Sequence, residues 1–157
     1  MRFTLLVAIT FLLGACQSNR HVDYTEADAI TVVFSSDDLP AQPIICVPGE
    51  GIRETSMAVG LGGYKMLDDL NEAMKKSPEV RVTLPPGTPV IAGFRYSQRE
   101  RIAARKRCER MVSFDAEQGQ TYQLRLEKSP QCTITATRLQ DDSWVNQDIL
   151  DREPTCP

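Results

Sequence analysis

The chain has 157 residues, of which 18 are Lys or Arg and 21 are Asp or Glu, so its formal net charge is −3 at pH 7. This balance excludes a polycation that is built as a whole for nucleic acid. The length suffices for one domain with a hydrophobic core but not for two.

The first 15 residues have the layout of a secretory signal. Arg2 gives a positive start, and an uncharged apolar run follows it over 3–13. The run is well short of the roughly 20 residues that a permanent membrane-spanning helix needs. The small residues Gly14 and Ala15 then stand directly before Cys16. We therefore predict that 1–15 is a signal peptide.

The segment Leu13-Gly14-Ala15-Cys16 resembles the lipobox of bacterial lipoproteins. The resemblance implies cleavage before Cys16, lipidation of its thiol, and acylation of the new amino terminus by a fatty acid such as palmitate. Gln17 follows, whereas an aspartate at this place marks retention at the inner membrane in lipoproteins of enteric-type bacteria. The implied protein is a lipid-anchored outer-membrane lipoprotein that faces the periplasm. The alternative is an ordinary secretory signal with an incidental cysteine.

Cleavage before Cys16 would leave 142 residues with 17 basic and 21 acidic side chains, a formal charge of −4. Residues 16–28 are polar and predict a tether between the lipid and a single domain over 29–157. His21, the only histidine of the chain, lies in this tether and is expected to be an ordinary surface residue.

The domain is expected to be mainly β, an antiparallel β-sandwich of about seven short strands with one short helix. Apolar residues at helical spacing, with acids early and lysines late, predict the helix over 64–76. The last three strands are separated by tight turns and are expected to form an antiparallel meander. The predicted strands span 29–34, 44–47, 80–84, 90–96, 112–114, 122–126 and 132–139.

Four cysteines remain after Cys16, an even number that predicts two disulfides in an exported chain. We pair Cys108 with Cys132 because each begins a strand of the meander, and Cys46 with Cys156 by elimination. Outer strands of a meander lie about 9.6 Å apart, so the first pairing requires that the strand ends converge. No C-x-x-C pair is present, so the sequence suggests neither a zinc knuckle nor a thioredoxin-like site.

The segment 80–139 is similar to small proteobacterial envelope lipoproteins of unassigned function. The similarity rests on an L-P-P-G turn, a cysteine before V-x-F, an acidic-Gln-Gly turn, and T-Y-x-L before a second cysteine. These motifs are structural, so the resemblance bears on fold and compartment alone.

No catalytic residue, metal ligand or cofactor site is predicted. The single histidine lies outside the domain, so a Ser-His-Asp or Cys-His arrangement cannot be built in it. The glycine-rich segment 60–63 lacks the Gly-Lys-Ser/Thr ending of a phosphate-binding loop. Three acidic pairs fit turns or an exposed helix face; they are Asp37-Asp38, Asp68-Asp69 and Asp141-Asp142.

A basic run between Gln98 and Arg110 gives the best candidate site. It carries a formal charge of +4, which leaves −8 on the rest of the mature chain. Guanidinium groups bind phosphate and carboxylate in a fork, so the run predicts a surface for an anionic envelope component or protein. It contains no aromatic residue, so nucleic acid is not an expected partner. The candidate interaction surface comprises Arg99, Arg101, Arg105, Lys106 and Arg107.

Four interpretations stay open. The run could instead be a solvated loop or short helix that keeps an edge strand from aggregating. The first functional hypothesis is a non-enzymatic, membrane-anchored binding or adaptor module. The second is an inhibitor of an envelope-attacking hydrolase, such as a muramidase or protease, which needs a protruding loop. The weakest is a hydrolase that uses paired carboxylates, which requires two acids in one cleft.

Overall fold

The computed structural model describes residues 20–36, 41–55, 79–99, 105–127 and 132–156. The mainly β prediction is confirmed, but the described residues form ten strands and not about seven, and they contain no helix. The helix predicted over 64–76 lies outside the described residues. The strands are β1 (Ile30–Ser36), β2 (Ala41–Val47), β3 (Gly51–Glu54), β4 (Val80–Leu84), β5 (Val90–Arg99), β6 (Arg105–Phe114), β7 (Thr121–Glu127), β8 (Thr133–Gln140), β9 (Ser143–Asn146) and β10 (Leu150–Arg152).

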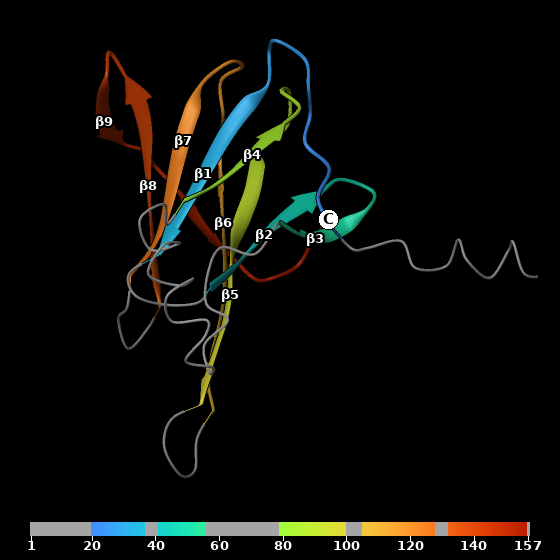
Figure 1. Cartoon of the computed structure of the whole chain (residues 1–157), viewed down its shortest axis with the longest axis vertical. Coiled ribbons are helices and arrows are strands. Elements are labelled where there is room, and N and C mark those ends of the chain that lie inside the picture. The colour runs from blue at the N-terminus through green and yellow to red at the C-terminus, as the bar shows by residue number, and fades with distance from the viewer. Residues whose placement is uncertain (1–19, 37–40, 56–78, 100–104, 128–131, 157) are drawn as a thin grey trace, which may run out of the picture.

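The strands form two five-stranded sheets (Figure 1). The first sheet has the order β4-β1-β7-β8-β9 and the second has the order β10-β6-β5-β2-β3. Neighbouring strands are antiparallel except β1 and β7, which pair in parallel from Thr31 with Thr121 to Ser36 with Leu126. This parallel pair joins segments about 90 residues apart in the chain.

The predicted meander over 112–139 is wrong in one respect. β6 belongs to the second sheet, whereas β7 and β8 belong to the first. The acidic-Gln-Gly turn therefore carries the chain from one sheet to the other, with Gly119 at φ +71°. Alternating apolar residues look the same in both cases, because the period of two reports a buried face and not the identity of the neighbouring strand.

One hydrophobic core lies between the two sheets. Alternate apolar residues of the predicted strands are buried in it, including Val82 on β4, Phe94 on β5 and Leu124 on β7. Phe34 of the first sheet meets Phe94 of the second edge to face, with ring centroids 5.5 Å apart. Each fully buried side chain of this size contributes about 1.5–3 kcal/mol. The shared core therefore holds the sheets face to face.

A smaller apolar cluster covers the opposite face of the second sheet. Ile44, Cys46 and Met111 are buried there and pack against Ile52, Ile91 and Cys156. The Cys46–Cys156 disulfide, with its Cα atoms 5.3 Å apart, fastens the C-terminal tail to this face.

The second disulfide joins Cys108 to Cys132, with Cα atoms 6.3 Å apart. Both pairings are the ones that the sequence predicts. The reason given for the second differs, since Cys108 lies on β6 of the second sheet and Cys132 directly precedes β8 of the first. The bond therefore links two sheets and does not cross a meander.

The acidic pair Asp141-Asp142 forms the two-residue turn between β8 and β9. Both residues have positive φ values, 48° and 59°, as the favoured hairpin turns require. Aspartate tolerates this conformation, so the prediction of turn chemistry is confirmed for this pair. The pairs at 37–38 and 68–69 lie outside the described residues.

Candidate functional site: the basic hairpin arm

The β5–β6 hairpin extends beyond the rest of the described strands (Figure 1). β2 pairs with β5 only from Ala92 to Tyr96, and β10 pairs with β6 only from Met111 to Ser113. Beyond these positions β5 and β6 are paired with each other alone among the described strands, up to Arg99 opposite Arg105. We call the segments 97–99 and 105–107 the hairpin arm. Its paired part is about 10 Å long at the usual rise of a strand.

Where the arm joins the second sheet, Arg95 is paired with two carboxylates. Arg95 donates to Glu109 across the ladder, with Nη2 2.7 Å from Oε1, and to Glu54 of β3, with Nη1 3.0 Å from Oε1. The hydrogen bond to Glu109 is the main reason that the pKa of Arg95 is raised. All three side chains are partly exposed, so the network contributes at most about 1 kcal/mol for each pair.

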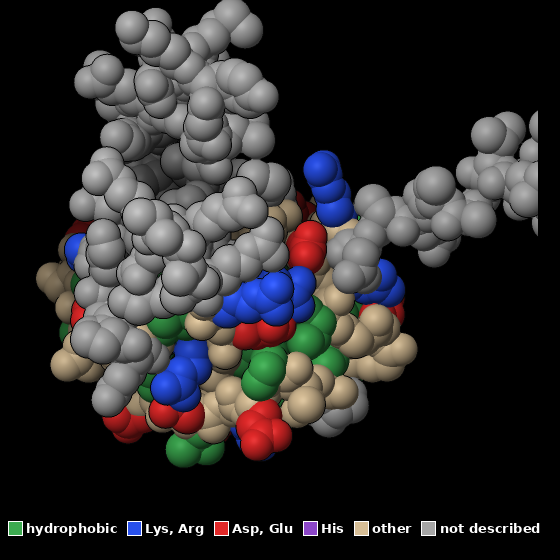
Figure 2. Space-filling view, turned by 90° about the horizontal axis from the view of Figure 1, so that it is seen from below, with side chains coloured by type: hydrophobic (Ala, Val, Ile, Leu, Met, Phe, Trp, Pro, Cys, Tyr) green, Lys and Arg blue, Asp and Glu red, His purple; other side chains and the backbone are tan. Residues whose placement is uncertain are grey.

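The register of the arm brings cationic residues of β5 and β6 together. Its register places Arg99 opposite Arg105, Gln98 opposite Lys106, and Ser97 opposite Arg107. Like charges at directly opposite positions destabilise an antiparallel pair, so this arrangement does not serve the stability of the hairpin. By contrast, basic and acidic side chains lie next to each other over the described surface at this end of the body (Figure 2). The excess positive charge is therefore local to the arm.

The predicted interaction residues are brought together in part. Arg99, Arg105, Lys106 and Arg107 lie on the last positions of the two paired strands, and Arg107 is exposed. Arg101 and the lipobox residue Cys16 lie outside the described residues. The alternative interpretation of the basic run as a loop or short helix is wrong for its described parts, 98–99 and 105–110, which are strand. The sequence does not predict strands in the arm, because 97–99 and 105–107 contain no apolar residue that could alternate with polar ones.

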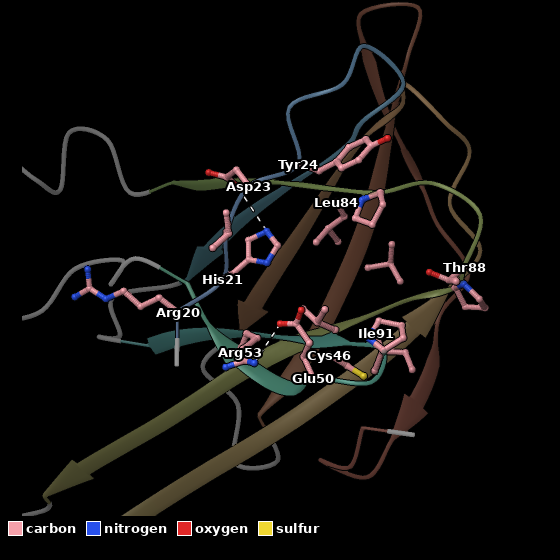
Figure 3. A pocket seen from close by; sticks show the side chains of 16 residues that line it. Arg20, His21, Asp23, Tyr24, Cys46, Glu50, Arg53, Leu84, Thr88 and Ile91 are labelled. Carbon is pink, nitrogen blue, oxygen red and sulfur yellow. Dashed lines mark ion pairs between the residues drawn. The ribbon is translucent and has the colours of Figure 1, made fainter. Parts of the chain in front are cut away.

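A separate cavity of about 310 Å³ lies away from the arm, beside the turn that joins β2 to β3. It is enclosed by the N-terminal segment 20–24, the β2–β3 hairpin and the β4–β5 turn (Figure 3). Two ion pairs stand in its wall, Asp23 with His21 at 3.6 Å and Glu50 with Arg53 at 3.1 Å. Each carboxylate thus has a basic side chain beside it. Sequence reasoning missed this cavity, because it is assembled from three distant segments that share no motif.

The expected tether over 16–28 is corrected from Arg20 onward, since 20–24 straps both sheets. The backbone N–H of His21 donates to the carbonyl of Glu54 in the second sheet, at 2.7 Å. In the first sheet, Tyr24 N–H donates to the Thr83 carbonyl and the Thr83 hydroxyl donates back to the Tyr24 carbonyl, at 3.2 and 2.6 Å. We call residues 20–24 the N-terminal strap.

His21 is not an ordinary surface residue. Its side chain is only 6% exposed, and its Nε2 lies 2.9 Å from the Thr83 carbonyl. A carbonyl can only accept, so Nε2–H is the donor. The ring therefore fixes the strap to β4 while the backbone of the same residue fixes it to β3.

His21→Ala is expected to loosen the strap and to lower the free energy of unfolding by about 1–2 kcal/mol, because a buried side-chain hydrogen bond is lost. Hydrogen exchange at residues 20–24 and urea unfolding measure both effects. Val22→Ala is the matched control, since that side chain is 85% exposed and its loss should change stability by less than about 0.5 kcal/mol. Unchanged exchange at the Tyr24 amide in His21→Ala would show that the ring does not hold the strap.

The described residues contain no group of three or more His, Cys, Asp or Glu side chains arranged to hold a metal ion. Within the same part of the chain, no helix has the length and apolar character needed to cross a membrane. Comparison with known proteins finds no matching family model, no matching curated protein and no matching solved structure.

Proposed function

We propose that this protein is a lipid-anchored, non-enzymatic binding module of the bacterial envelope, and that the hairpin arm is its contact surface for an anionic partner. Cys16 is the anchor, and the domain, which we classify as a β-sandwich, faces the periplasm from the outer membrane. The partner is a phosphate- or carboxylate-bearing envelope component or an acidic protein face.

The observation that carries this proposal is the cross-strand register of the arm. Arg99 and Arg105 stand opposite each other, and Ser97 and Arg107 form another opposed pair two positions nearer the body, on a two-stranded ribbon that projects beyond the body. Repulsion between the cations is relieved when an anion binds between them, and forked guanidinium groups suit phosphate and carboxylate. Opposed cations destabilise the free hairpin, and a bound anion would remove that repulsion, so the arm is well suited to bind an anionic partner.

Two features support the compartment. Both disulfides agree with an oxidising environment outside the cytoplasm. The resemblance of 13–16 to a lipobox supports the anchor. Mass spectrometry of the purified protein tests it directly, since wild type should carry acyl chains and Cys16→Ala should carry none. A Cys16→Ala protein that retained acyl chains would remove the anchor from the proposal.

In-cell photo-crosslinking tests the arm. A photoreactive residue at Arg105 should give one dominant adduct, whereas the same residue at Thr135, an exposed position of β8 in the first sheet, should give far less. Mass spectrometry of the adduct identifies the partner as protein, lipid or glycan. Equal adducts at both positions would mean that the arm is only a solvated face.

Two double variants that remove the same charge test how strongly the arm contributes to partner binding. Arg105→Gln/Arg107→Gln should reduce partner recovery at least tenfold, because two forked contacts of about 1 kcal/mol or more are lost. The control is Arg81→Gln/Arg125→Gln, which removes the same charge from exposed positions of the first sheet. Both variants should remain folded. An equal loss in both would indicate that only net charge matters.

One observation favours a second candidate, an inhibitor of an envelope-attacking hydrolase. The two-stranded arm projects far enough from the body to enter a cleft (Figure 1). The purified protein would then block a muramidase or a protease in a standard activity assay, and Arg105→Gln/Arg107→Gln would relieve the block.

A further inference from the structure

The outer edge of β9 differs from the other three sheet edges of the described structure. The strap covers two of them, through His21 N–H to Glu54 on β3 and Thr83 N–H to Asp23 on β4, at 2.7 and 2.9 Å. β10 is only three residues long, and the Cys46–Cys156 disulfide fastens the tail that follows it. No segment of the described part of the chain bonds to the outer edge of β9 in this way, and all four residues of β9 are exposed.

The register shows which backbone groups of β9 are available. Gln147 N–H donates to the Ala136 carbonyl at 3.0 Å, so residues 147 and 136 form a hydrogen-bonded pair. In an antiparallel ladder such pairs alternate with non-bonded ones, so Val145 also bonds to β8 while Trp144 and Asn146 do not. The N–H and C=O groups of Trp144 and Asn146 therefore point outward, as a template for a further strand.

The surroundings of this edge are apolar and acidic. Of the four large hydrophobic side chains exposed in the described residues, two lie on β9, Trp144 at 45% and Val145 at 36%, and Leu150, at 66%, begins β10 four residues after β9 ends. Exposed Asp141 and Asp142 stand at one end of β9, and exposed Asp148 follows the other end. None of these three carboxylates forms an ion pair with another described residue.

We propose that the β9 edge binds an extended strand of a partner protein whose side chains alternate between apolar and Lys or Arg. The outward groups of Trp144 and Asn146 would supply main-chain hydrogen bonds, as in other cases of strand addition. The carboxylates at both ends favour cations, and the exposed indole of Trp144 attracts a Lys or Arg side chain through its ring face.

The charge of this site argues against pairing of β9 with its own copy. In an antiparallel pair of two β9 strands, the Asp141-Asp142 turn of one chain would lie beside Asp148 of the other, and like charges repel. The site is also distinct from the hairpin arm, since β9 and the arm lie at opposite ends of the molecule (Figure 1). An adaptor with two sites of opposite preference could join an anionic and a cationic partner.

Synthetic peptides test the proposal on the lipidated full-length protein in detergent. The probe alternates lysine with valine over seven residues, and the control alternates glutamate with valine. Trp144 is the only tryptophan of the chain, so its fluorescence reports the site. The lysine peptide should shift the emission of Trp144 and the amide resonances of Trp144 and Asn146, with an affinity at least tenfold higher than that of the glutamate peptide.

Two variants separate strand addition from simple charge attraction. Asn146→Pro removes an outward N–H without removing a bond to β8, so it should weaken binding of the lysine peptide at least tenfold, whereas Asn146→Ala should not. Asp141→Asn/Asp142→Asn keeps residues that suit the turn but removes two charges, and it should weaken binding by a similar factor. Circular dichroism and urea unfolding confirm that each variant remains folded.

Three results would overturn the proposal. One is an equal response to both peptides. Another is undiminished binding of the lysine peptide by folded Asn146→Pro. The third is a Trp144 shift that depends on protein concentration without peptide and disappears in Arg105→Gln/Arg107→Gln, which would assign the edge to the arm of a second copy.

Discussion

Cys46→Ala/Cys156→Ala is expected to lower the free energy of unfolding by about 5 kcal/mol, the largest effect of any disulfide change in this chain. The bond closes a loop with a sequence separation of 110 residues, and the entropy that a cross-link removes from the unfolded chain grows with loop length. Alanine avoids placing hydroxyl groups in the apolar cluster with Ile44 and Met111. A loss of this size should reduce Tm by about 15 °C.

The matched control is Cys108→Ala/Cys132→Ala, which opens a loop with a sequence separation of only 24 residues. The same entropic relation gives about 3.5 kcal/mol for it, so the long-range pair should cost more by about 1 kcal/mol. Urea unfolding of oxidised protein, followed by circular dichroism, measures both. If the Cys46 and Cys156 variant lost less than about 1 kcal/mol, the C-terminal tail would contribute little to the stability of the second sheet.

Gly93→Ala is expected to have the second large effect and to lower the free energy of unfolding by about 3–5 kcal/mol. A methyl group at Gly93 would lie closer to the carbonyl oxygen of Arg110 than non-bonded atoms allow, and 2.7 Å from the Cα atom of Met111. These are backbone atoms of β6, so no side-chain rotation relieves the clash. β5 and β6 would have to separate in the middle of their ladder, which also supports the hairpin arm.

Gly87→Ala is the control for a general penalty of replacing glycine. Nothing lies within 4 Å of a methyl group there, but φ is +95°, so only backbone strain of about 1–3 kcal/mol is expected. In urea unfolding, Gly93→Ala should have a lower free energy of unfolding than Gly87→Ala. Equal losses would show that β5 and β6 can adjust, and that the close approach at Gly93 is not a constraint.

A substantial part of the fold can be predicted from the sequence. The period of two indicated the buried faces of β4, β5 and β7, because a strand with one face on a core needs apolar residues at every second position. β1 was predicted from its β-branched residues instead, and Val32, Val33 and Phe34 are buried there in succession. Three strands escaped prediction, since β3, β9 and β10 have three or four residues and none is buried. Without a buried face, a strand leaves no alternation in the sequence.

The sites were less accessible to prediction. The charge of the basic run was visible, but the opposition of Arg99 and Arg105 depends on the hairpin register, which local composition does not fix. The strap was hidden for a related reason, since a polar segment such as 20–24 looks the same whether it is free or bonded to two sheets. The β9 edge became apparent only through the hydrogen-bond alternation that Gln147 and Ala136 reveal.

The sequence by itself determined the mainly β class, the four cysteines that form two disulfides, the concentrated positive charge and the resemblance of 13–16 to a lipobox. These properties depend on composition and on short periods along the chain. Only the tertiary structure decided which strands are neighbours, as in the parallel pairing of β1 with β7, and which edges stay open. Strand neighbours are chosen by the packing of the whole core, a sum over distant residues that no local pattern records.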